Sequence, residues 1–269
     1  MPKNKLQQAE SPKETWNRRS SHYDEYYETL EGAIENHLDW QLLKRYLPND
    51  KKARILDAAG GTGRIAVLLA KRGYSVTLCD ISPGMLERAR RKLLQENIIG
   101  KVDLIECDVS RLCFADESFD FALCWGATID AIKELIRVTK EGGKISVYLV
   151  NKIRAAVQRF RQDPRSAISM LRSKYCSVYD RGERHVAIGA EDAKELFEKQ
   201  GIKVIDTYAV CGMLEFLSIP DEVRRSRAWD DRFFKQITQL LLRLSKEPSA
   251  KGLSRHLVLY GERVLADRR

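Results

Sequence analysis

The segment Arg54-Ile-Leu-Asp-Ala-Ala-Gly-Gly-Thr-Gly-Arg-Ile-Ala66 joins an apolar run, an acid and a group of glycines. Ile55 and Leu56 suit a strand that is buried on both faces, and the glycines that follow permit a tight turn. Apolar residues return at helical spacing from Ile65. We therefore predict a strand, a turn and a helix, whose N-terminus offers unpaired N–H groups and a positive dipole end to a polar or anionic ligand.

Two acids near the turn narrow the choice of ligand. The spacing Gly61-x-Gly63-x-x-Ala66 also fits the dinucleotide fingerprint. Asp80 ends the next apolar run, where it can accept hydrogen bonds from both hydroxyls of a ribose. Asp57, at the end of the first strand, would repel a pyrophosphate but attract the ammonium and sulfonium charges of S-adenosylmethionine. The acids therefore favour S-adenosylmethionine over a nicotinamide dinucleotide.

In combination, these motifs resemble the class I S-adenosylmethionine-dependent methyltransferases over roughly Ala53 to Leu149. The first motif has Ala59 where that family usually has glycine, and Asp80-Ile-Ser-Pro-Gly-Met85 resembles its small-molecule branch, with the quinone C-methyltransferases nearest. The resemblance implies an α/β, Rossmann-like fold. Its seven-stranded sheet would have six parallel strands and an antiparallel last strand, with flanking helices and helical cap insertions.

The resemblance also implies roles for individual residues. Asp57 and the turn would hold the methionine end of the cofactor, Asp80 the ribose, and Asp108 the adenine amino group. The full set of expected cofactor-binding residues is Tyr27, Asp57, Ala59, Gly61, Gly63, Asp80, Ile81, Met85, Asp108, Val109, Trp125 and Gly126. The expected substrate-binding residues are Tyr23, Thr128 and Arg184, and no metal is expected.

His185 is the candidate for a catalytic base, because only histidine titrates near neutral pH without a shift in its pKa. The alternative is a surface histidine within the charged stretch Asp180-Arg-Gly-Glu-Arg-His185. Methyl transfer itself is a displacement for which positioning and exclusion of water supply most of the rate, so a dedicated base is optional.

The composition places the chain among cytoplasmic globular proteins. Its 269 residues are 43% hydrophobic, and no run approaches the roughly 20 apolar residues of a membrane span. Its first residues lack an apolar secretory core, and the six cysteines have no metal or redox spacing.

The pattern along the chain divides it into five segments. We expect a disordered tail at 1–20, a helical lid at 21–50 and the cofactor-binding core at 51–150. A basic helical cap at 151–190 would follow, and then the remainder of the sheet at 191–269 with a helical insertion at 211–255.

The molecule that accepts the methyl group is the part of the function that the sequence determines least. The stretch 151–185 contains nine Lys or Arg and three acids, a net charge of +6, and would attract an anionic substrate if it roofs the site. We therefore expect methyl transfer to a small, anionic molecule. An RNA methyltransferase and a non-catalytic S-adenosylmethionine-binding regulator are the alternatives, and the oligomeric state is left open.

Overall fold

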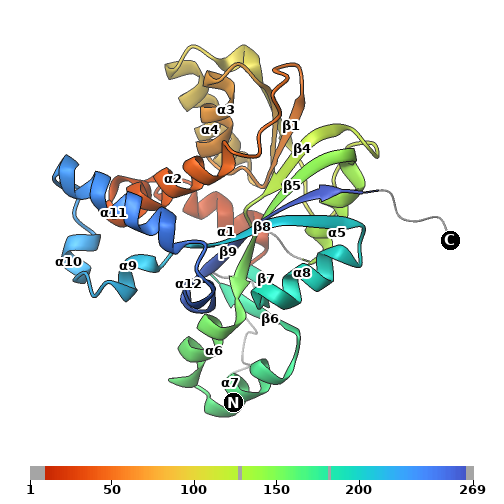
Figure 1. The fold of residues 1–269 in the computed structure, drawn as a ribbon. Helices are drawn as coiled ribbons and strands as arrows, with labels where there is room; N and C mark the ends of the chain where they lie inside the picture. Colours follow the sequence, from red (N-terminus) through yellow and green to blue (C-terminus); the bar gives the residue numbers. More distant parts are fainter. Residues whose placement is uncertain (1–9, 127–128, 181–182, 265–269) are drawn as a thin grey trace, which may run out of the picture.

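A nine-stranded sheet forms the centre of the molecule (Figure 1). The computed structural model describes residues 10–126, 129–180 and 183–264. The strands run in the order β3-β2-β1-β4-β5-β7-β6, and β9 pairs with both β5 and β8. The strands are β1 (Arg54–Ala58), β2 (Ser75–Asp80), β3 (Val102–Glu106), β4 (Phe119–Cys124), β5 (Thr139–Asn151), β6 (Tyr175–Asp180), β7 (Glu183–Ile188), β8 (Ile202–Val210) and β9 (His256–Arg263).

Helices cover both faces of this sheet and extend beyond its ends. They are α1 (Pro12–Arg19), α2 (Leu30–Leu43), α3 (Arg64–Lys71), α4 (Pro83–Gln95), α5 (Ile129–Val138), α6 (Lys152–Phe160), α7 (Pro164–Arg172), α8 (Ala190–Glu198), α9 (Met213–Phe216), α10 (Asp221–Arg224), α11 (Asp231–Leu244) and α12 (Pro248–Leu253), with 3-10 turns η1 (Tyr23–Glu28) and η2 (Ile99–Lys101). No helix in the described part of the chain combines the length and apolar composition needed to cross a membrane.

The central strands are apolar on both faces because helices cover both. Along β1, Ile55 packs with α3 and α4, whereas the neighbouring Leu56 packs with α5 and α8 on the other face. Both side chains are fully buried. Successive side chains of a strand point to opposite faces, so a continuous apolar run is the pattern that a two-sided core requires. A third core joins α2 to α9 and α11 beside the sheet.

The expected α/β, Rossmann-like architecture is confirmed, but the sheet has more strands than the expected seven. Strands β1 to β5, β8 and β9 correspond to those seven, with β9 antiparallel to β5 and β8. The two added strands, β6 and β7, form an antiparallel hairpin. The hairpin joins the sheet because β5 continues to Asn151, where Val150 and Asn151 pair in parallel with β7. The segment 151–190 is thus helical only in its first half.

The N-terminal segment also differs from the expected disordered tail. Residues 12–19 form α1, and a capping box fixes its start: the Ser11 hydroxyl accepts from the Glu14 N–H, and the Glu14 carboxylate accepts from the Ser11 N–H at 2.9 Å. Pro12 suits the first helical position because its missing N–H needs no partner there. These local signals outweigh the polar composition of the segment.

Candidate cofactor and substrate site

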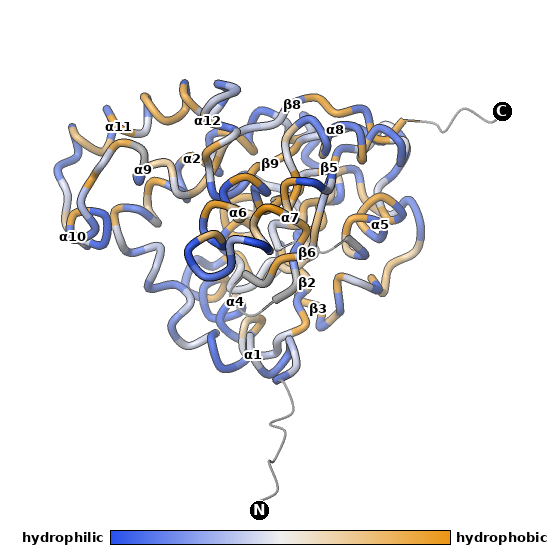
Figure 2. The backbone as a smooth tube through the Cα atoms, turned by 90° about the horizontal axis from the view of Figure 1, so that it is seen from below, coloured by the Kyte–Doolittle hydropathy of each residue, from blue (hydrophilic) through white to orange (hydrophobic). Residues whose placement is uncertain are grey.

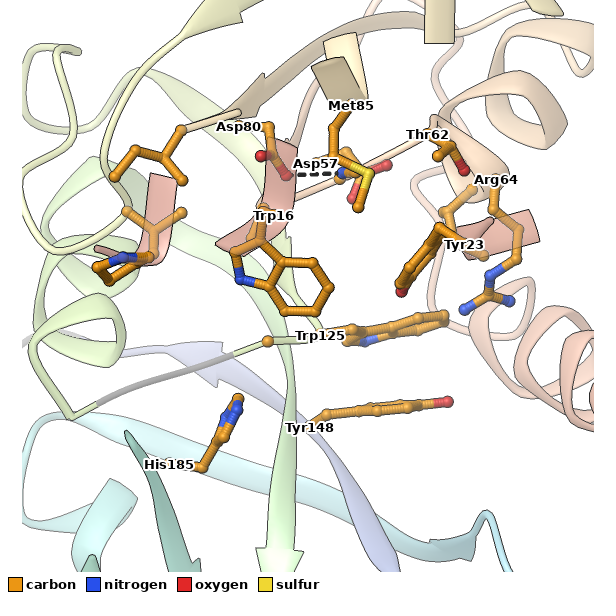
Figure 3. Close-up of a pocket in the computed structure, with 18 of the residues that line it drawn as sticks. Trp16, Tyr23, Asp57, Thr62, Arg64, Asp80, Met85, Trp125, Tyr148 and His185 are labelled. Atoms are coloured by element: carbon orange, nitrogen blue, oxygen red, sulfur yellow. Dashed lines mark hydrogen bonds between the residues drawn. The ribbon is translucent and has the colours of Figure 1, made fainter. Parts of the chain in front are cut away.

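A cavity of about 550 Å³ opens at the carboxyl ends of β1, β2, β4 and β5 (Figure 3). Open parallel sheets bind ligands at this edge, and this volume lies within the usual range for small-molecule sites. The expected site residues that line it are Tyr23, Tyr27, Asp57, Ala59, Gly61, Asp80, Ile81, Met85, Asp108, Val109, Trp125, Gly126 and His185.

Three expected site residues are not among these lining residues. Gly63 has φ 77° and precedes α3 as its N-cap, and a Cβ atom there would lie 3.1 Å from the Ala89 Cβ. Its role is to permit the turn and the packing of α3 on α4. Arg184 occupies β7 opposite Tyr179 in the register, with its side chain outside the described part of the structure. Thr128 lies outside the described residues.

The turn after β1 brings backbone close to the cavity. Ala59 and Gly61 have φ of 54° and 56°, and a Cβ atom on Gly60 would lie 2.9 Å from the Asp57 Cγ. Glycine is therefore required at Gly60 by contact and favoured at Gly61 by conformation. Ala59 adopts the same left-handed region despite its side chain, and a Cβ atom built on Gly126 would lie 3.8 Å from its methyl group.

Asp57 and Asp80 place two buried carboxyls at one end of the cavity. The Asp57 side chain is 4% exposed, and its Oδ2 has no hydrogen-bond partner among the residues that the structure describes. Burial raises its pKa to about 7, although the nearby positive charge of Arg64 acts in the opposite direction. A buried oxygen without a partner is costly, so Asp57 is suited to a ligand that brings a donor or a cation.

Asp80 is held by the backbone of the same turn. Its Oδ2 accepts from the Gly61 N–H (Figure 3) and its Oδ1 from the Ser82 N–H, both at 2.9 Å. Burial raises its pKa to about 6, against the effect of these backbone donors. Each carboxylate oxygen can accept a second hydrogen bond, so both remain able to take a hydroxyl. The expected ribose contact fits this geometry.

The site is open at the position expected for adenine. Asp108 follows β3 and is exposed, and its Oδ1 accepts from the Ser110 N–H at 2.8 Å and from the Ser110 hydroxyl at 2.7 Å. This loop geometry leaves the second carboxylate oxygen available. The three acids expected to contact the methionine end, the ribose and the adenine, namely Asp57, Asp80 and Asp108, thus line one cavity.

The N-terminal residues form a lid over this edge. Asn17 on α1 accepts from the Ser82 hydroxyl at 2.7 Å and from the Gly84 N–H at 2.9 Å, which attaches α1 to the start of α4. In η1, Asp24 accepts at 2.7 Å both from Thr62 in the turn and from Lys92 on α4. These contacts hold the lining residues Trp16 and Tyr23 over the cavity.

An arginine and stacked aromatic rings form the opposite wall (Figure 3). The Arg64 guanidinium lies 4.6 Å from the Tyr27 ring centroid and 5.7 Å from that of Trp125. Trp125 stacks on Tyr148 at 4.7 Å, and Tyr148 stacks on His256 at 6.1 Å. Such a surface suits a planar ring.

Asp39 on α2 fixes this wall from behind. Its Oδ2 lies 3.0 Å from the Arg64 Nη1, and its Oδ1 accepts from the Tyr148 hydroxyl. Burial raises the pKa of Asp39 to about 7, with Arg64 acting to lower it. Arg64 is thus paired with Asp39, and it also donates to Asn36 at 2.9 Å.

Several lining residues were not anticipated from the sequence. They include Trp16, Asp39, Thr62, Arg64, Tyr148 and His256. Thr62 and Arg64 lie within the glycine-rich segment itself, and Tyr148 lies near the carboxyl end of a predicted strand, so position alone could have indicated these three. Nothing in the local sequence marks Asp39 or His256, because the tertiary fold brings them to the cavity.

Comparison with known proteins finds similarity to methyltransferases. Residues 55–143 match the methyltransferase domain family. The ubiquinone/menaquinone biosynthesis C-methyltransferase of Rhodopseudomonas palustris (strain BisB5) is 39% identical over 105 residues, which are 36% of this chain and 42% of that protein. The enzyme of the same name from Pseudomonas fluorescens (strain SBW25) is 31% identical over 156 residues, which are 54% of this chain and 60% of that protein. The matches thus span about half of each relative.

Among solved structures, a putative S-adenosylmethionine-dependent methyltransferase from Listeria monocytogenes has the same fold. Its TM-score is 0.59 at 16% sequence identity, and the superposition covers 87% of this chain and all of that one. Residues 55–143 are thus similar to the methyltransferase domain family, and the chain shares its fold with S-adenosylmethionine-dependent methyltransferases. Within that class, its sequence is similar to the quinone C-methyltransferases.

The two buried carboxyls predict that cofactor binding depends on pH. Cofactor cations and hydroxyls are bound by the ionised forms, and the raised pKa values of about 7 for Asp57 and about 6 for Asp80 keep part of the protein protonated below neutrality. We expect the affinity for S-adenosylmethionine to rise with pH, at least about tenfold from about pH 5.5 to about pH 8. Calorimetry in buffers of different ionisation enthalpy should show proton release on binding. Affinity that is independent of pH over this range would contradict the assignment of Asp57.

Proposed function

We propose that this chain transfers a methyl group from S-adenosylmethionine to a small acceptor with a hydroxylated aromatic ring. The observation that carries the proposal is the buried Oδ2 of Asp57, which has no hydrogen-bond partner within the described ranges, in the same cavity as the stacked pair of Trp125 and Tyr148. The acid suits the cationic cofactor, and the flat aromatic wall suits the ring of an acceptor. The names of the similar proteins favour carbon as the methylated atom.

The charged side chains that line the cavity restrict the kind of negative charge that the acceptor can carry. The described lining residues include several acids, whereas their one arginine, Arg64, is already paired with Asp39. The described residues of α6 and α7, where the sequence concentrates its basic side chains, do not line the cavity. A permanently charged phosphate would therefore lack a partner. We infer an acceptor that becomes anionic only at the reacting centre, by losing a hydroxyl proton.

The cofactor, when bound, supplies a methyl group on a sulfonium cation. The residues of this chain would orient the acceptor ring against Trp125 and Tyr148 and exclude water beneath Trp16 and Tyr23. His185 on β7 lines the same cavity, and its imidazole is the group that we propose to accept the hydroxyl proton. Removing that proton concentrates negative charge on the ring, which makes its carbon and oxygen atoms better nucleophiles.

The test follows radioactive label from the methyl group of S-adenosylmethionine. The purified protein, incubated with hydroxylated aromatic compounds and with fractions of a cell extract, should move label into a small organic molecule. His185→Ala should lower the rate at least about tenfold and remove the limb of the pH–rate profile near neutrality. His22→Ala is the control, because His22 lies at the start of the lid with a side chain 77% exposed.

Two results would overturn the proposal. Label that stays on the cofactor with every fraction would favour a regulator that binds S-adenosylmethionine without catalysis. Label recovered in RNA would favour an RNA methyltransferase. An unchanged pH profile in His185→Ala would remove His185 from the reaction and leave the acceptor class standing.

A further inference from the structure

Helices α6 and α7 carry an exposed apolar surface that the proposed reaction does not use. Along α6, Ile153, Val157 and Phe160 recur at spacings of four and three residues and are 43%, 57% and 56% exposed. On α7, Ile168 and Leu171 are 51% and 55% exposed. Tyr175, at the start of β6, is a further large apolar residue and is 47% exposed. The docking face is defined here as these six residues.

The way in which the two helices pack explains why this face is exposed. The described buried side chains between Asn151 and Ser173 include the small ones of Ala156 on α6 and Ala167 on α7, each 3% exposed. The two helices thus bury small residues, whereas their large apolar residues are exposed to solvent. Water-soluble helical hairpins have the opposite arrangement, and clustered exposed apolar residues indicate an interaction surface.

Basic side chains accompany the docking face. Arg159, Arg161, Arg165 and Arg172 are exposed and make no ion pair with any residue in the described ranges 10–126, 129–180 and 183–264. The other three cations of α6, α7 and the following turn are used internally: Lys152 pairs with Asp192, Arg154 with Glu215, and Lys174 with Glu195. The four arginines thus remain available to an anionic partner.

We propose that the docking face and its four arginines bind the surface of a lipid bilayer that contains anionic lipids. Short helices with one apolar and one basic face lie in the interface between headgroups and acyl chains, and arginine adds attraction to anionic headgroups. Phosphates of RNA would use the arginines but would leave Ile153, Val157 and Leu171 in water. The bilayer is the partner that satisfies both the apolar and the basic residues.

The position of α6 and α7 in the fold agrees with this role. They extend from the end of the sheet at which β5 finishes (Figure 1), and seen from below they face the viewer with apolar and polar residues side by side (Figure 2). Tyr148 and Val150 of β5 line the cavity, and α6 begins at Lys152. A bilayer bound here would lie next to the elements that hold the acceptor; this last point rests on the proposed function, whereas bilayer binding does not.

Vesicle sedimentation of the full-length protein, without cofactor, tests the proposal. We expect binding to vesicles of equimolar phosphatidylcholine and phosphatidylglycerol, and at least about tenfold weaker binding to phosphatidylcholine alone. Val157→Ser/Phe160→Ser and, separately, Arg159→Glu/Arg165→Glu should each weaken binding at least about tenfold. The matched control is Leu94→Ser/Leu240→Ser, at positions 53% and 43% exposed elsewhere on the surface.

All of these positions are exposed, and thermal melting will confirm that each variant is folded. No sedimentation with either vesicle would overturn the proposal, as would equal losses in the control variant. Stoichiometric binding of transfer RNA at physiological salt that is unaffected by Val157→Ser/Phe160→Ser would assign the arginines to RNA instead. Because no methyl transfer is measured, this test succeeds or fails independently of the proposed reaction.

Discussion

Replacing Asp57 with asparagine is expected to weaken S-adenosylmethionine binding about a hundredfold while leaving the protein folded. The carboxylate at this position is buried and its Oδ2 has no hydrogen-bond partner in the described part of the chain, so its charge is available to a cationic ligand. An amide keeps the shape but loses the charge, and hydrogen bonds to charged groups contribute about 1.5–3 kcal/mol. A hundredfold change corresponds to about 2.7 kcal/mol. Calorimetric titration of the cofactor measures it.

The same substitution should not lower stability at neutral pH. Because burial raises the folded pKa of Asp57 to about 7, above its value of about 3.8 in the unfolded chain, its contribution to stability falls as pH rises from about 4 to about 7. The neutral amide avoids this loss. We expect the free energy of unfolding of Asp57→Asn to equal or exceed that of the parent at about pH 8, as measured by urea denaturation.

The matched control is Asp120→Asn, at the opposite end of the sheet. Asp120 accepts from the Arg54 N–H at 2.8 Å and pairs with Lys140 at 2.7 Å, so it holds strands together and lies away from the cavity. This variant should lose stability and keep the affinity for the cofactor. Loss of cofactor affinity in Asp120→Asn together with normal binding by Asp57→Asn would contradict the assigned site.

Replacing Arg64 with methionine should lower the free energy of unfolding by about 3 kcal/mol. Arg64 is the cation that Asp39 faces at 3.0 Å, and the two side chains are 16% and 3% exposed. Removing one partner of a buried pair leaves the other charge without compensation, which costs about 3–5 kcal/mol. For a chain of this size the melting temperature should fall by about 6–12 °C. Arg90→Met, at an exposed position of α4, is the control.

The pH dependence and a double variant identify the cause of that loss. Without Arg64, the pKa of Asp39 should rise above its present value of about 7, because burial acts unopposed. Protonation then relieves the uncompensated charge, so the loss of stability should be smaller at about pH 6 than at about pH 8. Arg64→Met/Asp39→Asn should recover most of it. A double variant no more stable than Arg64→Met would show that the ion pair is not the reason.

The sequence alone determined the elements whose causes are local. The glycines after Asp57 permit one kind of turn, and the apolar runs on either side specify a strand and a helix. Because carboxyl ends of parallel strands meet at one edge of a sheet, the acids that end β1 and β2 were predicted to lie together, and the structure places Asp57 and Asp80 in one cavity. The start of α1 was equally local, since its capping box is visible at Ser11 and Glu14.

Tertiary structure alone decided the wall of the cavity and the added hairpin. Asp39 and Tyr148 are 109 residues apart and meet only because α2 packs beside β5, so no sequence spacing could reveal their hydrogen bond. Likewise, β6 and β7 are strands because the end of β5 extends to Asn151 and offers unpaired backbone groups to β7. Contacts of this kind depend on which edges and faces the completed fold leaves open, and that information is not local to any segment of the chain.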